Sequence, residues 1–545
     1  MGEPEIDLWQ AARRHAGQQH AGSGSPNEMA GTEMNKRLLG PLTTMLALAI
    51  AGCTTVKDRD PIELAIRNVT VVSPERSVPL ENVDVLIDKG RIISIERKDN
   101  RRATQEIDGA GRFLTPGLID GHVHLYHATG LSRRYTKSFD VLFDTFQKQQ
   151  PRSYLYFGYT TVVELNADFD INRQFENAPV HPDLIHCGQG LVLSNDFMAT
   201  DFDSEVEFFA AFPNFLHDRF TTPVLPAGFD PKEHTPTATI TRIAENGGRC
   251  VKIYYEEALW WPPESRPHFA LPSEAIVREV VAAAHARGMP VLLHGTTPAA
   301  YKLAADTGVD VVAHGLWDWD GAFLGHDAIP NEAMEAIEGI VGTDVAVQPT
   351  MQTVANTLSL FTPDLVNDPD LRKVLPAAYL TYLRTDAQRG RDAFLRRNGP
   401  ILADAFARGQ AASADPEQIA RTYFERMKRI VTGMNTRDIP LLFGTDTAVG
   451  GAGWGNPPGL NGYWEMQDWA RAGIPLATIF RAATLDNARK FGLTADLGSI
   501  EVGKRANLLL MSRNPLESIN AYDSIDVILL NGRMLDRETL AASAK

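Results

Sequence analysis

The sequence predicts an α/β fold, a (β/α)8 TIM barrel joined to a small β-sandwich domain that is formed from both termini. The first observation is a series of eight short apolar runs between Leu114 and Thr447, separated by longer helix-like stretches. Such runs are typical of parallel strands buried on both faces. The second is that alternating polar and apolar runs lie on either side, in residues 62–112 and 496–545. They predict half-exposed strands at both ends.

Residues 34–53, MNKRLLGPLTTMLALAIAGC, predict an export signal. A basic start precedes an apolar run that is shorter than the roughly 20 residues needed to span a bilayer. The ending Ala-Gly-Cys resembles the lipobox of bacterial lipoproteins. We therefore expect residues 1–53 to comprise an upstream extension, residues 1–33, and a lipoprotein signal peptide. Cys53 would carry the lipid, the protein's only membrane contact. The alternatives are an ordinary cleaved signal peptide and a chance apolar run.

The lipoprotein interpretation implies an exported protein on the periplasmic face of a bacterial membrane, and Thr54 and Thr55 suggest the outer membrane. The other two cysteines, Cys187 and Cys250, are too few for a disulfide scaffold. Both lie in apolar runs, so we expect buried, inert thiols. The net charge of −15 argues against nucleic acid as a partner, because phosphate binding requires a basic surface.

The barrel is expected over residues 113–495, and its eight strands follow one another as apolar runs. In chain order they are residues 118–124, 160–165, 184–191, 250–255, 290–295, 309–315, 344–351 and 440–447. Residues 272–288 and 477–492 have apolar side chains at helical spacing. Two insertions, 196–245 and 355–435, fall where β-to-α loops belong. We expect lids or contacts in a homo-oligomer, with surface decoration as the alternative.

Metal-binding side chains follow several of these strands. His122 and His124 end the first strand, where residues i and i+2 share a face, and neutral imidazole is a common metal ligand. Further candidates end other strands: Lys252, His294, His314 and Asp446. Each has a structural explanation of its own, since a His can be satisfied in a core, a Lys can snorkel and an Asp can cap a helix. All six together predict a metal site at the C-terminal mouth of the barrel.

These residues lie in motifs that resemble those of the amidohydrolase superfamily, in the same order. The motifs are TPGLIDGHVHL, FGYTTVVEL, VKI, VLLHG, VAHG, GTDT and GSIEVGKRANLLL. The resemblance covers the chain from about residue 62 onward and is greatest to the prolidase-like and imidazolonepropionase-like branch. The chain departs from the family at Asn507, where Asp is usual, and in the long stretch between the last two strands.

The resemblance implies two divalent metal ions. One would be held by His122, His124 and Asp446, the other by His294 and His314. A protonated Lys cannot bind a metal, but a buried Lys loses its proton readily. Lys252, carboxylated by CO2, would then bridge the two ions. Zinc is the expected metal, and Mn, Co and Fe suit the same ligands. The alternative is a single-metal site in which Lys252 is structural, as in imidazolonepropionases.

The implied activity is hydrolysis of an amide or peptide-type C–N bond in a small substrate such as a dipeptide or an N-acyl amino acid. Metal-bound hydroxide would attack the polarised carbonyl, with Asp446 as general base and then general acid. The alternatives are a cyclic amide (imidazolone or lactam) hydrolase or a deaminase, a lactonase or esterase-type hydrolase, and a metal-binding lipoprotein without catalysis.

Aromatic residues follow the metal-binding strands and predict an apolar substrate pocket. They are Tyr254, Tyr255, Trp260, Trp261, Trp317 and Trp319. Packing between the insertions is the alternative explanation for them. His127 and Arg266 are candidates for binding a substrate carboxylate. We therefore expect an amino acid as product, and a substrate whose aromatic or bulky side is accepted.

Overall fold

The computed structural model describes residues 61–542 apart from 132–135, 168, 203, 223, 260–265, 320–328, 360–362, 393–395, 397–415 and 449–454. Contacts separate the chain into two units, of which Asp60–Lys545 contains the described residues. The expected signal peptide and Cys53 lie outside the described residues. Among the helices that are described, none is both long and apolar enough to cross a membrane.

Parallel strands form the wall of a barrel. Three belong to one sheet, β6 (Leu118–Val123), β7 (Tyr159–Glu164) and β8 (Asp183–His186), and four to another, β9 (Val251–Tyr254), β10 (Val291–His294), β11 (Val311–Ala313) and β12 (Ala346–Gln348). Three isolated parallel bridges complete the circuit: Leu191 with Ile253, Val347 with Leu441, and Val123 with Thr447. The fold is therefore a TIM-barrel-like α/β fold. The eighth expected strand, 440–447, is present through bridges instead of as a continuous strand.

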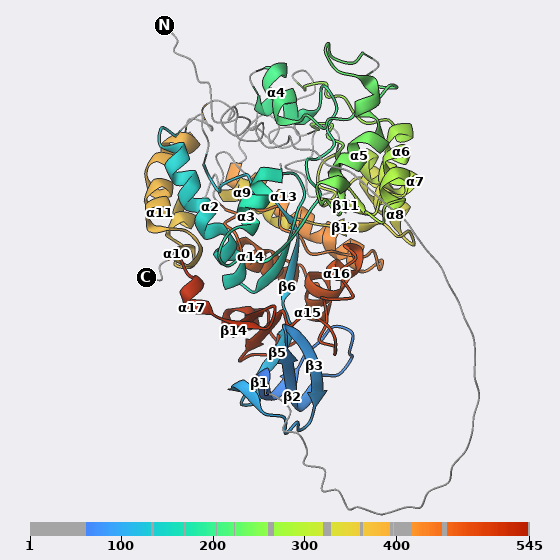
Figure 1. Ribbon diagram of the computed structural model, residues 1–545. Coiled ribbons are helices and arrows are strands. Elements are labelled where there is room, and N and C mark those ends of the chain that lie inside the picture. The colour runs from blue at the N-terminus through green and yellow to red at the C-terminus, as the bar shows by residue number, and fades with distance from the viewer. Residues whose placement is uncertain are drawn as a thin grey trace, which may run out of the picture. The chain divides into compact units, whose positions relative to one another are not determined.

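Helices alternate with these strands in the chain, and α5, α6, α7 and α8 pack side by side in sequence order (Figure 1). The α-helices are α2 (Phe139–Tyr156), α3 (Phe169–Glu176), α4 (Glu205–Ala211), α5 (Pro236–Glu245), α6 (Glu274–His285), α7 (Pro298–Thr307), α8 (Asn331–Ile340), α9 (Met351–Ser359), α10 (Leu371–Val374), α11 (Ala377–Arg384), α13 (Pro416–Asn435), α14 (Leu460–Arg471), α15 (Leu476–Arg481), α16 (Asn487–Lys490) and α17 (Arg537–Leu540). The short 3-10 helices are η1 (Phe197–Asp201), η2 (Pro231–His234), η3 (Pro363–Asn367) and η5 (Ile519–Ser524), and η4 (Ala482–Asp486) is a π-helix.

Helix α6 illustrates why the predicted helices form. Ser273 caps it by accepting a hydrogen bond from the N–H of Ile276, which satisfies one of the free donors of the first turn. Its apolar residues recur at helical spacing and are buried. After the helix, Gly288 adopts a φ of +66°, a conformation that glycine reaches without steric cost.

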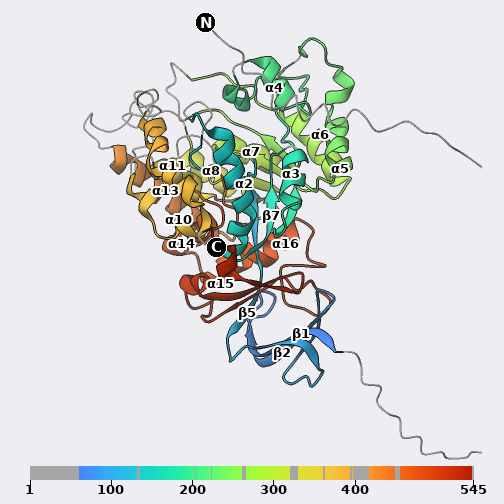
Figure 2. The ribbon, with the colours of Figure 1, turned by 60° about the vertical axis from the view of Figure 1, so that its left-hand side comes forward.

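Both ends of the described unit contribute to one mixed sheet, as predicted (Figures 1 and 2). Its strands are β1 (Ile62–Val71), β2 (Leu80–Asp88), β3 (Arg91–Glu96), β4 (Ala103–Asp108), β5 (Phe113–Pro116), β13 (Leu508–Met511), β14 (Ile525–Leu530) and β15 (Arg533–Asp536). Strand β5 joins the two ends, because it pairs with β1 on one side and with β13 on the other. That this sheet folds into a sandwich stays a prediction.

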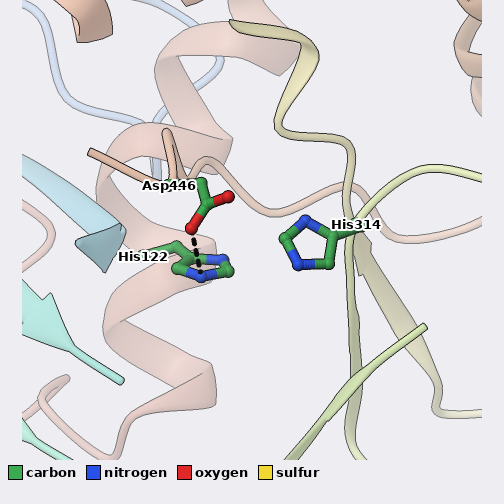
Figure 3. Close-up of side chains that lie close together, drawn as sticks. All are labelled: His122, His314 and Asp446. Carbon is green, nitrogen blue, oxygen red and sulfur yellow. Dashed lines mark ion pairs between the residues drawn. The ribbon is translucent and has the colours of Figure 1, made fainter. Parts of the chain in front are cut away.

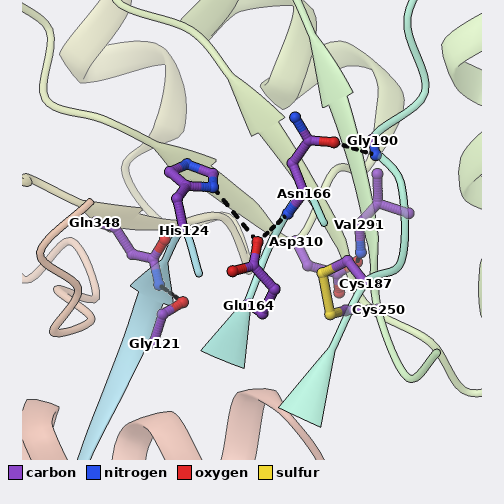
Figure 4. The surroundings of a disulfide bond; sticks show 10 residues. All are labelled: Gly121, His124, Glu164, Asn166, Cys187, Gly190, Cys250, Val291, Asp310 and Gln348. Atoms are coloured by element: carbon purple, nitrogen blue, oxygen red, sulfur yellow. Dashed lines mark hydrogen bonds and ion pairs between the residues drawn. A yellow bond between two sulfur atoms is a disulfide. The ribbon is translucent and has the colours of Figure 1, made fainter. Parts of the chain in front are cut away.

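The expectation of two inert thiols was wrong. Cys187, directly after β8, and Cys250, directly before β9, form a disulfide bond, with their Cα atoms 4.4 Å apart (Figure 4). Counting cysteines missed this pair, because it depends on β8 and β9 belonging to successive segments of the barrel wall. The bond closes a loop with a sequence separation of 63, for which a chain-entropy model gives a stabilisation of about 4 kcal/mol.

The two expected insertions are integrated with the barrel in different ways. In 355–435, α13 packs against α9 and α14, while α10 and α11 pack against α2. In 196–245, phenylalanines of η1 and α4 form a cluster that includes the strand residue Tyr254. These contacts argue against surface decoration for both segments. Their roles as lids or oligomer contacts stay predictions.

We predict that Asn507→Asp destabilises the protein by roughly 1–3 kcal/mol. The Asn507 amide donates to Asp183 Oδ2 over 2.9 Å, and its Oδ1 accepts from the N–H of Asn531. An Asp would keep the second bond but would place two carboxylates together. Urea unfolding at pH 7 measures the loss, and the double variant Asn507→Asp, Asp183→Asn should restore most of it. An Asn507→Asp protein as stable as the parent would contradict this role.

Candidate metal centre

The first and last barrel strands bring three polar side chains to one point. The Nε2 atoms of His122 and His124 lie 3.1 Å and 2.9 Å from Oδ1 of Asp446, and 3.3 Å from each other. Figure 3 shows His122 and Asp446 in contact, with His314 facing them. Three potential ligand atoms from two strands thus converge in the interior.

Asp120 aligns these two strands. Its Oδ1 accepts from the backbone N–H groups of His122 and Thr445, and its Oδ2 accepts from the Thr445 hydroxyl at 2.7 Å. Because Asp120 is 1% exposed, these bonds are needed to offset the burial of its carboxyl group. They fix His122 relative to Asp446 before any ligand binds.

Strands β10 and β11 position a second pair of histidines. His294 Nδ1 lies 2.8 Å from His314 Nε2, and His314 Nδ1 lies 2.9 Å from the Thr350 hydroxyl. The ring centroids of His122 and His314 are 5.3 Å apart. The two pairs therefore form one cluster.

The chemistry of this cluster fits a divalent cation. Ligand atoms of His122, His314 and Asp446 all lie within 4.8 Å of one another, and all three residues are buried. Imidazole nitrogen with carboxylate oxygen is a donor set that zinc accepts. Burial, reinforced by Lys252, lowers the pKa of His122 and of His294 to about 3. Both rings are thus neutral at pH 7 and have a lone pair available for a metal.

The pKa of His124 shifts in the opposite direction, but its environment also fits a divalent cation. Burial disfavours its protonated form, but the carboxylates of Asp446 and Glu164 outweigh burial and raise the pKa of His124 to about 9. Oδ1 of Asp446 lies 2.9 Å from Nε2 of the ring, and Oε1 of Glu164 lies 3.5 Å from Nδ1. The same negative surroundings would favour a bound metal cation.

Lys252, on β9, interacts electrostatically with His122, His294 and Asp446. It is 1% exposed, and within the described part of the chain its Nζ has no hydrogen-bond partner. Burial, opposed by Asp446 and Glu164, lowers the pKa of Lys252 to about 7. A buried amine without a partner costs free energy, so its presence points to a function.

Sequence reasoning missed two buried glutamates around these histidines. Glu164 ends β7, lies 3.5 Å from Nδ1 of His124 and accepts from the N–H of Asn166 (Figure 4). Glu256, two residues after β9, lies 3.1 Å from Nε2 of His294. A charged residue at the end of an otherwise apolar run was the available signal in both cases.

A third missed residue contacts Asp446 directly. Thr353, on α9, donates its hydroxyl to Oδ2 of Asp446 at 3.1 Å. The N-terminus of α9 is in turn held by the buried carboxylate of Glu465, which accepts from the N–H groups of Met351 and Gln352. The side chain of Asp446 is therefore fixed at both of its oxygens.

The expected substrate residues differ in their position relative to the metal centre. Tyr254 and Trp317 lie at the metal centre, with ring centroids 5.5 Å from His294 and 5.3 Å from His314. His127 lies 6.4 Å from His124, also ring to ring. Tyr255 packs instead against the main apolar core and is half-buried.

The structure gives no substrate-binding contact for the remaining expected residues that it describes. Trp319 packs under the guanidinium of Arg426, at 3.9 Å from the ring centroid, which agrees with the packing alternative for this residue. Arg266 donates to the backbone carbonyl of Leu259. Trp260 and Trp261 lie outside the described residues.

Comparisons with known proteins agree with the motifs. Residues 401–535 match the amidohydrolase family. A dihydroorotase of Carboxydothermus hydrogenoformans is 48% identical over 61 residues, which are 11% of this chain and 14% of that protein. The chain thus matches only about one seventh of the length of this curated relative.

Solved structures resemble the whole described unit. A prolidase in complex with N-methylphosphonate-L-proline has a TM-score of 0.58 and 19% identity, covering 87% of this chain and 99% of its own. The ochratoxinase of A. niger has a TM-score of 0.59 and 15% identity, covering 89% and 99%. At such identities these similarities show the fold. The match to the amidohydrolase family itself is confined to residues 401–535.

Proposed function

We propose that this protein is a metal-dependent hydrolase that cleaves an amide or peptide-type C–N bond in a small substrate, such as a dipeptide or an N-acyl amino acid. The observation that carries the proposal is the convergence of His122, His124, His294, His314 and Asp446 from different strand ends into one buried cluster. The match to the amidohydrolase family and the structural similarity to a prolidase support the bond type.

Two ions would divide the ligands between them. His122, His124 and Asp446 would hold one, and His294 and His314 the other. Lys252 would join them once its neutral Nζ has added to CO2, forming an N–C bond and releasing a proton to give a carbamate. When bound, divalent ions supply a Lewis acid and lower the pKa of water.

The protein's own residues would transfer protons and orient the group that transfers them. Among the described residues, Asp446 is the one carboxylate in direct contact with both His122 and His124, so we assign it proton transfer from the attacking water to the departing nitrogen. Thr353 keeps Oδ2 of Asp446 oriented through its hydroxyl. Removing one positioned acid–base group typically costs a factor of 10² to 10⁴ in rate.

Aromatic residues beside the second histidine pair support a substrate with a bulky or aromatic side. Phe197 of η1 stacks on His294 with centroids 5.1 Å apart and an interplanar angle of 21°, and it also contacts Tyr254 and Phe269. Trp317 contacts His314. The Phe-rich insertion therefore reaches the metal centre and would form one wall of the substrate site.

We predict that Phe197→Ala raises KM for substrates with an aromatic side by about tenfold, because burial of one aromatic ring contributes roughly 1.5–3 kcal/mol. Substrates with a small side should change much less. Phe202→Ala is the matched control, since Phe202 belongs to the same cluster but contacts Phe208 and Phe212. Equal losses for both variants, or for both substrate types, would contradict a wall formed by Phe197.

We also propose export as a lipoprotein anchored at Cys53, on the periplasmic face of the outer membrane. The Cys187–Cys250 disulfide supports an oxidising compartment, because such bonds form and persist outside the reducing cytosol. Labelling cells with a radioactive fatty acid tests this: Cys53→Ala should lose the label.

The proposed activity is tested by offering residues 54–545, purified with zinc and bicarbonate, a mixed library of dipeptides, N-acyl amino acids and cyclic amides. Release of free amino acids, read by mass spectrometry, is the expected result. Ring opening or ammonia release would instead indicate a cyclic amide hydrolase or a deaminase. Metal binding with no turnover of any amide would reject the proposed bond type.

A further inference from the structure

The geometry points to Glu256 as the positioning residue that decides which nitrogen of His294 faces the metal centre. This inference rests on the proposed function, because it concerns a ligand of the same site. Glu256 lies in the loop after β9, two residues beyond the end of the strand, and its side chain is 9% exposed. A carboxylate this deeply buried needs partners that compensate its desolvation.

In the described part of the chain, Glu256 has a partner at each of its two oxygens. Its Oε2 lies 3.1 Å from Nε2 of His294, and its Oε1 accepts from the N–H of Ala258 at 2.5 Å. Ala258 adopts a φ of +53°, so the loop turns back onto the carboxylate. The loop thereby fixes one oxygen and leaves the other directed at His294.

This contact sets the orientation of the imidazole. A neutral imidazole donates from one nitrogen and accepts at the other. If Nε2–H of His294 donates to Glu256, the lone pair is on Nδ1, which lies 2.8 Å from Nε2 of His314. His314 is held in the opposite sense, because its Nδ1 contacts the Thr350 hydroxyl. The two rings therefore present different nitrogens to one point.

Aromatic side chains also pack against the imidazole ring of His294. Phe197 stacks on the ring, and Tyr254 contacts it at a tilt of 41°. These contacts limit tilting but do not distinguish Nδ1 from Nε2, since a ring flip would preserve the stacking. Unlike Phe197 and Tyr254, Glu256 makes a contact that depends on which nitrogen of His294 is protonated. Outer carboxylates of this kind typically contribute a factor of 10 to 100 in metal affinity.

The test uses Glu256→Leu, which removes the acceptor, and Glu257→Leu as the matched control. Glu257 is the next residue of the same loop, but its carboxylate accepts from the Thr297 hydroxyl at 2.5 Å. The full chain is stripped of metal, and zinc affinity and stoichiometry are measured by competition with a chromophoric chelator. The visible spectrum of the Co²⁺-loaded proteins reports the ligand environment independently of activity.

We expect Glu256→Leu to weaken the affinity of one of the two zinc ions 10- to 100-fold and to change the Co²⁺ spectrum, and Glu257→Leu to stay within about threefold of the parent. Glu256→Gln, which keeps an acceptor oxygen, should recover part of the affinity and serves if the Leu variant does not fold. Parent-like affinity in both Glu256 variants, or an equal loss in Glu257→Leu, overturns the positioning role alone. A parent protein that binds no zinc overturns the proposed function with it.

Discussion

Replacing Asp446 by Asn should lower kcat on the amide substrate at least 10³-fold while leaving most of the zinc bound. The amide keeps one oxygen that can face His122 and His124, so much of the ligand set survives. It cannot accept a proton from attacking water at neutral pH, so general base and general acid catalysis are both lost. Steady-state kinetics with metal content measured on the same preparation separates the two effects.

Thr353→Val is the control for Asp446→Asn, because it removes the hydroxyl that contacts Oδ2 but leaves the carboxylate in place. We expect a loss of about tenfold or less, since one hydrogen bond to a charged group contributes roughly 1.5–3 kcal/mol and part of it is regained from water. An Asp446→Asn enzyme that keeps more than a tenth of the parent kcat would show that another group transfers the proton.

The position of this centre could be predicted from sequence because barrel topology determines it. Each of His122, His294, His314 and Asp446 ends or follows an apolar run, and the C-terminal ends of parallel strands meet on one face of a barrel. The prediction therefore needed only strand order and the period of two along a strand. No distances or side-chain angles were required.

The groups around the centre could not be predicted in the same way. Glu256, Glu164 and Thr353 act through contacts that depend on how a loop turns or where a helix begins. The Cys187–Cys250 bond likewise depends on the adjacency of β8 and β9, which a count of cysteines does not contain. The same holds for Phe197, which meets His294 only because the insertion folds back over the strand ends.

Replacing Lys252 by Met should have opposite effects on the metal-free and the metal-loaded protein. Lys252 is fully buried, and among the described residues its Nζ has no hydrogen-bond partner. Removing this polar group should stabilise the metal-free protein by about 1–3 kcal/mol, the usual cost of burying such a group without a partner. Met occupies a similar apolar volume, so packing should change little.

In the metal-loaded protein the same change should remove the bridging group, lower the zinc content toward one ion and reduce kcat by about 10³-fold or more. Lys252→Glu tests the reason, because its carboxylate offers two oxygens on a shorter side chain and should recover part of the zinc content without bicarbonate. A Lys252→Met protein that is less stable without metal would mean that Lys252 has a structural role. If it instead kept two zinc ions and parental kcat, the carbamate bridge would be rejected. One zinc ion in both the parent and the Lys252→Met protein, with equal kcat, would support the single-metal alternative.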